Sequence, residues 1–466
     1  MYDAVKGIPK SEPRLLERCN RDMGLSRRQL LTRGGIVGAS TAAAAGGYLA
    51  GRQIAQDDAG AEQPDGARPE PEGPLFALDP DYVNLTTFVL ASHPRPVRAA
   101  IERHRRALDK DAALYLRSSE VSLEAASRRA VAGYLGTKPE LVALTDSTTM
   151  GLALVYARLR LGPGEEVVTT EHDFFATHES LRLRERLDGV AVRRIRLYDE
   201  PESASADEIV AAVSRALRPS TRCLALTWVH SSSGVKLPLR EIADAVAAAN
   251  RGRRERERIL LCVDGVHGFG VEDESPVDVG VDVFASGCHK WLFGPRGTGF
   301  IWAAPHAWAR LAPTIPSFDP RVYVAWVERR QPADAPPGAL MTPGGFHSFE
   351  HRFALPEAIE LHTELGGRAE VARRTRALAT ALKDGLTETA AVRLKTPRDE
   401  SLSAGLVCCE IAGADPGEVV DQLRKRHRVV ASVTPYRTRY VRLGPSVANT
   451  AGDVDTALEA IARVRS

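Results

Sequence analysis

The chain has 466 residues, enough for two or three domains with separate hydrophobic cores. Its formal net charge is only +2, so the composition gives no sign of a nucleic-acid partner. Six cysteines are present without Cys-x-x-Cys spacing, and four of them lie in apolar runs: Cys223, Cys262, Cys408 and Cys409. This pattern favours buried free thiols over a disulfide framework or a metal site.

The first 75 residues predict an export signal and a linker. Arg27 and Arg28, within the run SRRQLL, match the twin-arginine pattern, and a weakly hydrophobic Gly/Ala-rich stretch follows at 34–51. That stretch is poor in large apolar residues for a stable membrane span. We therefore expect 1–51 to be a twin-arginine signal region read by the Tat export machinery. The protein would then be periplasmic or otherwise extracytoplasmic, cleaved or held by an uncleaved N-terminal anchor, with 52–75 as a disordered linker. The alternative is an accidental Arg-Arg pair before an Ala-rich arm.

From residue 76 the pattern indicates an α/β domain. Helical character is expected at 97–107 and 122–135. Apolar strands then alternate with helices: strands at 141–144, 166–169, 190–197, 222–228, 259–263, 281–286 and 299–303, and helices at 149–159, 177–187, 206–216 and 239–250. This alternation predicts a mostly parallel sheet with helices on both faces, forming a large domain at 76–330. Functional side chains should gather at the carboxyl ends of its strands.

The remaining chain predicts a smaller α+β domain. Residues 312–345 are rich in Pro and Gly and favour a long surface or interface loop. Helices are expected at 355–386, at 416–425 and from Asp453, and short strands at 393–396, 405–411, 429–432 and 440–443. We assign 331–466 to the interface loop and the small C-terminal domain.

The most informative residues follow two of the predicted strands. Asp264 and His267 lie in the string VDGVHGFG, and His289-Lys290 lie in DVFASGCHKWLFGPRGTG. An acid, a histidine and a later His-Lys pair at strand ends are what a pyridoxal 5'-phosphate (PLP) enzyme needs. The lysine amine would form a Schiff base, and the carboxylate would pair with the protonated pyridine nitrogen. A plain Asp-Gly turn is the simpler interpretation of the first string alone, but it leaves the His-Lys pair unexplained.

Three further strings occur in an order that suits the same chemistry. TDSTTMG, with Thr148 and Thr149, joins a strand to a helix, where free N–H groups suit a phosphate, although an ordinary helix cap would look the same. TEHDFF carries His172 and Phe174 after the next strand, and YVRLGP carries Arg442 near the C-terminus. A guanidinium can hold a carboxylate with two hydrogen bonds.

Together these strings resemble the class V aminotransferase family of fold-type I PLP enzymes, specifically its isopenicillin N epimerase-like and cysteine desulfurase-like members. The likeness runs from about Asn84, a candidate substrate-binding residue, to the C-terminus. It implies that Thr148, Thr149 and His289 hold the phosphate, and that His172 stacks on the pyridine ring, with Phe174 as the alternative.

The resemblance also assigns the groups around the reacting atoms. Asp264 would hold the ring nitrogen, His267 would approach the phenolic oxygen, Lys290 would be the Schiff-base lysine and proton-transfer base, and Arg442 would bind the substrate carboxylate. It further implies a homodimer with shared active sites. One departure is Gly287, since many relatives have Ser or Asn two residues before the histidine.

These features predict a PLP enzyme that acts on an amino acid or small amine, with transamination, epimerisation or elimination as the outcome. A cysteine desulfurase-type activity is the alternative within the family, but 424–440 contains no cysteine to serve as its nucleophile. A catalytically silent exported binding protein is the alternative outside it. The motif HSFEH at 347–351 has the spacing of an inverted zinc-protease site, which requires a helix. The preceding Thr-Pro-Gly-Gly segment disfavours a helix, so we expect no metal there. The Arg/Glu run at 251–258 indicates a solvated loop.

Overall fold

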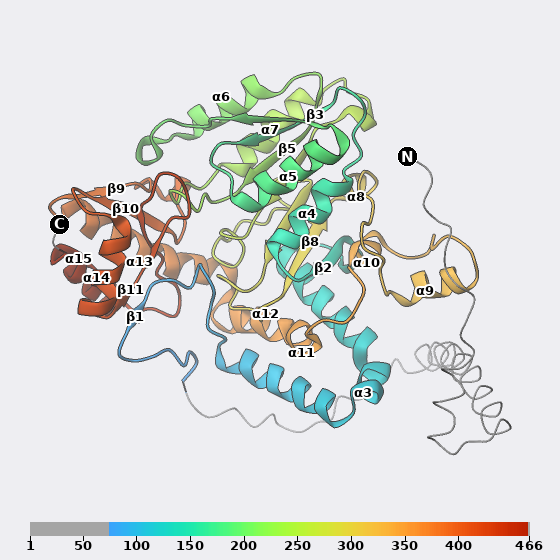
Figure 1. The fold of residues 1–466 in the computed structure, drawn as a ribbon, viewed down its shortest axis with the longest axis horizontal. Helices are drawn as coiled ribbons and strands as arrows, with labels where there is room; N and C mark the ends of the chain where they lie inside the picture. Colours follow the sequence, from blue (N-terminus) through green and yellow to red (C-terminus); the bar gives the residue numbers. More distant parts are fainter. Residues whose placement is uncertain (1–73, 465–466) are drawn as a thin grey trace, which may run out of the picture. The chain divides into compact units, whose positions relative to one another are not determined.

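The computed structural model describes residues 74–464, so the predicted signal region at 1–51, and all of the predicted linker except 74–75, lie outside the described residues (Figure 1). Within this range a seven-stranded sheet has the order β2-β8-β7-β6-β5-β3-β4. Only β8 runs antiparallel to its neighbours, so the sheet is mostly parallel, as predicted. Its strands are β2 (Val142–Thr145), β3 (Glu166–Thr170), β4 (Ala191–Ile195), β5 (Thr221–Thr227), β6 (Leu260–Asp264), β7 (Val283–Gly287) and β8 (Gly299–Ala303).

Both faces of this sheet are buried because apolar side chains point alternately to each side. In β5, Leu224 and Leu226 enter one core, and Cys223 and Ala225 enter the other. The first core includes side chains of α6 (Ala206–Ala216) and α7 (Leu239–Ala249), and the second those of α4 (Thr148–Arg158), α5 (Phe175–Asp188) and α8 (Pro305–Trp308). Helices therefore cover the two faces (Figure 1).

Two segments are more helical than the sequence predicts. The helices expected at 97–107 and 122–135 are joined in α3 (Arg95–Leu135), which is interrupted only where Asp111 is extended (φ −164°, ψ 93°). The Asp111 carboxylate accepts a hydrogen bond from Leu114 N at 3.0 Å, so it caps the second half. The expected loop at 312–345 contains α9 (Pro320–Val327) and α10 (Pro337–Met341), each of which begins at a proline.

The C-terminal part has its own sheet and core. Strands β12 (Ser432–Val433), β13 (Val441–Leu443), β10 (Val407–Ile411) and β9 (Val392–Leu394) form an antiparallel sheet in that order. Side chains of α13 (Gly367–Glu388), α14 (Pro416–His427) and α15 (Ala451–Ala462) complete its core. The strand expected at 429–432 is divided at Ala431, and β11 (Val429–Val430) pairs instead with β1 (Val83–Asn84).

Between the two sheets the chain forms α11 (Phe349–Phe353) and α12 (Leu355–Glu364), and α12 contributes Leu355 and Ala358 to the core of the large sheet. The predicted domain boundary at 330/331 stays a prediction. Among the residues that the structure describes, no helix combines the length and the apolar character needed to cross a membrane.

Candidate active site

The predicted acid and lysine meet at one edge of the large sheet. Strands β6 and β7 are parallel neighbours, and Asp264, the last residue of β6, is in register with Ala285 of β7. Lys290 follows β7 by three residues, and its Nζ lies 3.2 Å from Nε2 of His267. The sheet topology therefore brings together Asp264, His267 and Lys290, as the two strings predict.

Burial perturbs each of these groups. It raises the pKa of the Asp264 carboxyl to about 6, although a hydrogen bond from Val266 N and the nearby Lys290 both act in the opposite direction. Burial also lowers the pKa of Lys290 to about 8, with Asp264 opposing and Arg442 adding to the shift. The pKa of His267 is held well below its usual value by burial and then by the two cations. A lysine with this pKa has an appreciable neutral fraction near physiological pH, and the neutral amine is the form that acts as a nucleophile or base.

The predicted phosphate-binding residues Thr148 and His289 lie close to Gly287. Ser147 caps α4 by accepting from Met150 N at 3.1 Å, so Thr148 and Thr149 begin the helix. Thr148 Oγ1 accepts a hydrogen bond from Gly287 N at 2.7 Å and thereby joins the start of α4 to the end of β7.

The contacts at Gly287 explain the glycine that departs from the family pattern. A Cβ there would lie 2.6 Å from His289 Cε1 and 3.1 Å from Thr148 Oγ1. Glycine permits this close approach. The adjacent Ser286 donates its hydroxyl to the Gly287 carbonyl at 3.0 Å and is fully buried.

Arg442 comes from the other sheet and reaches the same region. Its Nη1 donates to the Ser231 carbonyl at 3.2 Å, and its Nε donates to Ser432 Oγ at 3.0 Å. The guanidinium lies over the ring of Phe88, 4.7 Å from its centroid. Among the described residues Nη2 has no acceptor, so a substrate carboxylate can bind at this nitrogen and Nη1. Burial lowers the pKa of Arg442, and its charge is among those that lower the pKa of Lys290.

The two candidates for ring stacking lie in different surroundings. His172 stacks on Tyr198, with centroids 4.0 Å apart and planes 15° apart, and its Nε2 accepts from Leu197 N at 3.3 Å. Phe174 packs edge-on to Tyr436, with centroids 6.2 Å apart. The choice between His172 and Phe174 as the stacking residue stays a prediction.

Sequence patterns missed the residues behind this region. The Tyr198 hydroxyl lies 2.8 Å from His230 Nδ1 and 3.1 Å from Ser233 Oγ, and all three residues are buried. The Tyr436 hydroxyl lies 2.7 Å from Ser231 Oγ, next to the carbonyl that holds Arg442. Local patterns gave no signal for these contacts because the partners are 32 to 205 residues apart.

Asp173, which no motif singled out, ties two strand ends together. Its Oδ2 accepts from Thr169 Oγ1 and Thr170 N, both at 2.7 Å, and its Oδ1 accepts from Thr227 N at 2.7 Å. Because it is one residue after His172, this buried carboxylate fixes the backbone from which His172 and Phe174 project. Its position in the string EHDFF was the available signal.

Two other sequence candidates have local roles. The Asn84 side chain accepts from Thr86 N at 2.9 Å and from Thr86 Oγ1 at 2.7 Å, while its carbonyl accepts from Asn449. Its role in substrate binding stays a prediction. In the HSFEH string, His347 precedes α11 and lies 3.9 Å from Glu124, whereas His351 is directed at the Arg296 carbonyl.

The donor set fits PLP by direct observation. His267 and His289 each have a buried Nδ1 without a hydrogen-bond partner among the described residues. The Asp264 carboxylate, 1% exposed, accepts one recorded hydrogen bond, from Val266 N at 3.0 Å. A phosphorylated pyridine with a ring N–H and a phenolic oxygen offers partners to such groups, whose burial without partners is otherwise costly.

Comparison with known proteins gives the family. The model of "Aminotransferase class-V" matches residues 112–452. The chain is also 30% identical to an isopenicillin N epimerase of Streptomyces clavuligerus over 76% of this chain and 88% of the relative. The chain therefore belongs to the class V aminotransferase family, as its motifs predict.

Other relatives broaden this result. The chain is 28% identical to an isopenicillin N epimerase of Amycolatopsis lactamdurans, over 76% of this chain and 87% of that protein. It is 28% identical to a probable hercynylcysteine sulfoxide lyase of Mycobacterium tuberculosis, over 51% of this chain and 55% of that protein.

Solved structures agree on the fold. A cystine C-S lyase, C-DES, in complex with cysteine persulfide, superposes with a TM-score of 0.73 at 19% identity, covering 82% of this chain and 98% of that one. Cysteine desulfurase CsdA from Escherichia coli gives 0.68 at 20% identity, covering 84% and 96%. The predicted fold-type I architecture is confirmed. The protein is a PLP-dependent enzyme of amino acids or small amines.

Proposed function

We propose that this enzyme removes the α-proton of a free amino acid, with Lys290 as the amine that bears the cofactor and as the base. The observation that carries the proposal is the pairing of Lys290 Nζ with His267 Nε2 at 3.2 Å, at a buried site where Asp264 and Arg442 act electrostatically on the lysine. An acid for the ring nitrogen, a base of lowered pKa and a carboxylate clamp thus converge.

Each side chain has a physical task in this proposal. When bound, PLP supplies an electron sink for the charge left at the substrate Cα. Asp264 would hold the proton on the ring nitrogen, and the protonated ring nitrogen would in turn favour the ionised form of the Asp264 carboxyl. Lys290 would take the substrate proton, since its pKa of about 8 leaves part of the amine neutral near neutral pH. Arg442 would orient the substrate through its carboxylate, and the N-terminus of α4 at Thr148 would hold the phosphate.

Among the three outcomes, we propose epimerisation. The relatives that the chain matches over 88% and 87% of their length are described as isopenicillin N epimerases, whereas the probable lyase is matched over 55%. Proton return to the opposite face of Cα distinguishes this outcome from transamination and elimination.

Proton exchange tests the proposal directly. The holoenzyme is incubated in D₂O with single L-amino acids, and each is analysed by mass spectrometry and chiral chromatography. We expect deuterium at Cα together with the D-enantiomer for at least one substrate, and neither with Lys290→Ala. A keto acid or a released β-group in place of the D-enantiomer would refute epimerisation alone. Absence of deuterium exchange from every amino acid would refute the proposed chemistry.

The desulfurase alternative is disfavoured by the state of the thiols. The five cysteines within the described residues are free and buried. Burial raises the pKa of Cys408, which is in register with Arg442, to about 12. A thiol of this kind is a poor nucleophile, because the thiolate is the reactive form. Release of sulfide from L-cysteine that depends on Cys408 would reverse this interpretation.

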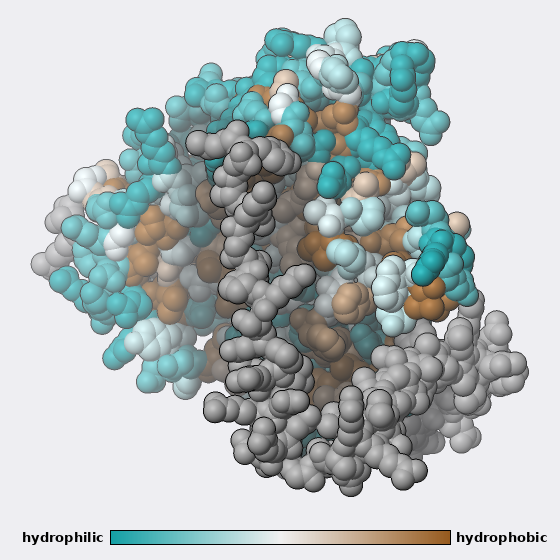
Figure 2. Space-filling view, turned by 45° about the vertical axis from the view of Figure 1, so that its right-hand side comes forward, coloured by the Kyte–Doolittle hydropathy of each residue, from teal (hydrophilic) through white to brown (hydrophobic). Residues whose placement is uncertain are grey.

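The family resemblance also leads us to propose a homodimer. Large apolar side chains are exposed along 315–327 and at 346: Ile315, Phe318, Tyr323, Trp326, Val327 and Phe346. Figure 2, in which the side of the molecule carrying α9 is turned forward, shows brown apolar surface among the teal hydrophilic surface there. Light scattering should give a dimer mass, and Trp326→Glu should lower it. A wild-type monomer would contradict the proposal.

Export by the twin-arginine route remains part of the proposal and rests on the sequence pattern around Arg27 and Arg28 alone. That route carries folded proteins, which suits an enzyme that must be loaded with its cofactor in the cytoplasm.

A further inference from the structure

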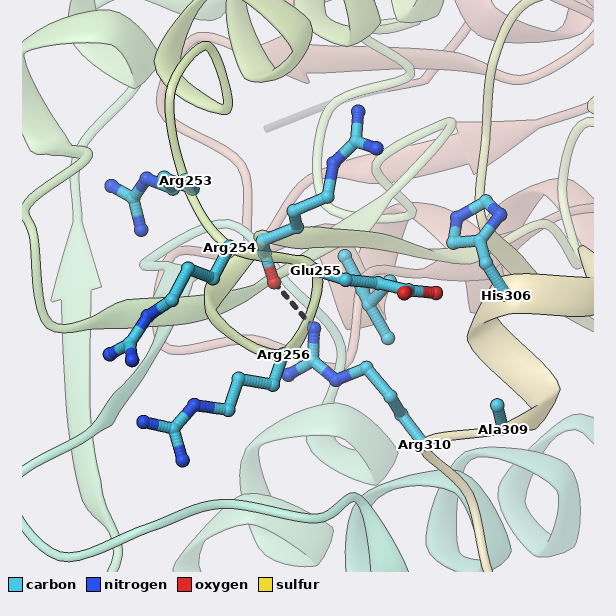
Figure 3. Close-up of a pocket in the computed structure, with 9 residues that line it drawn as sticks. Arg253, Arg254, Glu255, Arg256, His306, Ala309 and Arg310 are labelled. Atoms are coloured by element: carbon cyan, nitrogen blue, oxygen red, sulfur yellow. Dashed lines mark hydrogen bonds between the residues drawn. The ribbon is translucent and has the colours of Figure 1, made fainter.

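A hollow lies at the far end of strand β6 from Asp264. It has a volume of about 570 Å³ and is bounded by the loop between α7 and β6 and by the segment that follows α8 (Figure 3). Leu260, the first residue of β6, lines it, whereas Asp264 is the last residue of the same strand. The hollow and the active site therefore lie at opposite edges of the sheet.

The lining of this hollow is strongly cationic. Five arginines face a single glutamate, Glu255, and the other lining residues are His306, Leu260 and Ala309. His306 Nε2 lies 2.7 Å from Asp282 Oδ1, so this ring already has a partner. The sequence run at 251–258, which indicated a solvated loop, thus forms one wall of a basic hollow.

Two of the arginines hold the walls in place. Arg253 donates to the carbonyls of Arg218 at 2.7 Å and Thr221 at 2.9 Å, which fixes the loop to the start of β5. Arg310 donates through Nη1 to the Arg258 carbonyl, a bond visible in Figure 3, and joins the two walls. Nη2 of Arg310 is buried and has no acceptor among the described residues.

Of the remaining arginines, Arg256 and Arg258 are the ones available to a ligand, because Arg254 has a close carboxylate partner. Arg254 pairs with Glu257, whose other close cation, Arg256, is 3.9 Å away. Arg258 is exposed, and its guanidinium has no hydrogen bond or ion pair to any residue in the described range. In Figure 3 the side chains of Arg254 and Arg256 extend from the loop on one side, while Glu255 extends on the other, toward His306.

We propose that this hollow binds a ligand with two linked phosphate groups, either a free pyrophosphate-type compound or the phosphates of a lipid headgroup. Guanidinium groups bind phosphate oxygens in pairs, and several are needed to neutralise more than one phosphate. The volume accommodates a small molecule rather than one ion. The lining contains no Phe, Tyr or Trp side chain on which a nucleobase could stack, and its one imidazole, His306, is already paired with Asp282, so recognition is by charge.

Pyrophosphate titration of the holoenzyme tests the proposal, because bound PLP already fills the phosphate site of the active centre. We expect calorimetry to show saturable pyrophosphate binding with a Kd below about 5 mM. Arg256→Gln with Arg258→Gln should weaken it by about tenfold or more, since each removes a paired contact. The matched control, Arg218→Gln with Arg251→Gln, removes the same charge from exposed positions outside the lining and should change affinity by less than about twofold.

Vesicles distinguish the two sources of phosphate. If the ligand is a lipid headgroup, the holoenzyme should sediment with vesicles that contain cardiolipin, which carries two linked phosphates, and not with phosphatidylcholine vesicles. The Arg256/Arg258 variant should then no longer sediment with the cardiolipin vesicles. Turnover of both double variants should equal the wild type's. The proposal is overturned if neither probe binds, if both double variants bind like the wild type, or if both lose binding equally.

Discussion

Replacement of Asp264 by Asn should have opposite effects on the apoenzyme and on catalysis. The apoenzyme should become more stable at pH 8, because an ionised carboxyl no longer has to be buried. Turnover of the holoenzyme should fall by orders of magnitude, because the charge that keeps the cofactor ring protonated is lost.

The magnitude follows from the pKa of Asp264, which burial raises from 3.8 to about 6. The folded state therefore binds a proton more tightly than the unfolded state does, and stability falls as the pH rises from about 4 to about 6. At about 1.4 kcal/mol for each pKa unit, the ionised carboxyl costs about 3 kcal/mol above this window. Because the entropy of unfolding scales with chain length, the Asp264→Asn substitution should raise the Tm of an apoenzyme of this size by about 4 °C at pH 8.

Calorimetry of both apoenzymes between pH 3.5 and pH 8 measures this difference, which should vanish near the acidic end. Asp173→Asn is the control: it is equally buried, but its carboxylate accepts three hydrogen bonds, two of them from backbone N–H groups. It should destabilise the protein by about 1–3 kcal/mol. If Asp264→Asn lowered the Tm at pH 8, or if its effect were independent of pH, the assignment of a costly buried carboxylate would be wrong.

Four further predictions test the site and the signal. Uptake of PLP by the apoenzyme, followed by absorbance, should accelerate with pH to a plateau above about 8, because only the neutral Lys290 amine reacts and its pKa is about 8; a rise continuing to pH 10 would contradict this, as would a borohydride adduct on another lysine. Arg442→Lys should weaken amino-acid binding by about tenfold or more in spectral titrations while PLP affinity is kept, since a lysine lacks the paired contact; equal loss of both would refute the clamp. Gly287→Ala should lower PLP affinity, measured by equilibrium dialysis, because the added Cβ would lie 2.6 Å from the His289 imidazole and displace it. Unchanged affinity would show that the position of the His289 ring does not matter for PLP binding. Changing Arg27 and Arg28 to Lys should leave active enzyme in the cytoplasm by fractionation, and continued export would remove the twin-arginine assignment.

The sequence predicts that the residues at the ends of β6 and β7 lie close together, for a physical reason. Asp264 and Lys290 each follow an apolar strand, and adjacent parallel strands place their carboxyl ends at one edge. Periodicity and order along the chain therefore suffice to bring them together. The same reasoning gave most of the helices and strands, because alternating apolar segments are buried on both faces of one sheet.

What the sequence could not give depends on contacts between distant segments. Arg442 is held by the Ser231 carbonyl and the Phe88 ring, 211 and 354 residues away along the chain. The Tyr198–His230 contact behind His172 likewise joins separate strand ends. The continuity of α3 was missed because Asp111 interrupts the apolar pattern while capping the next turn.

The energetics of the site argue for the cofactor independently of any motif. Burial raises the pKa of Asp264, lowers the pKa of Lys290, and leaves Nδ1 of His267 and of His289 without partners. Each feature costs the folded protein free energy, and each would be relieved by a different part of one molecule: a protonated ring nitrogen, an aldehyde, a phenolic oxygen and a phosphate. A chain selected only for stability would remove such groups. Their coexistence at one edge of the sheet is explained if PLP binding offsets all four costs together. We therefore expect removal of the cofactor to destabilise the wild-type enzyme more than it destabilises the Asp264→Asn variant.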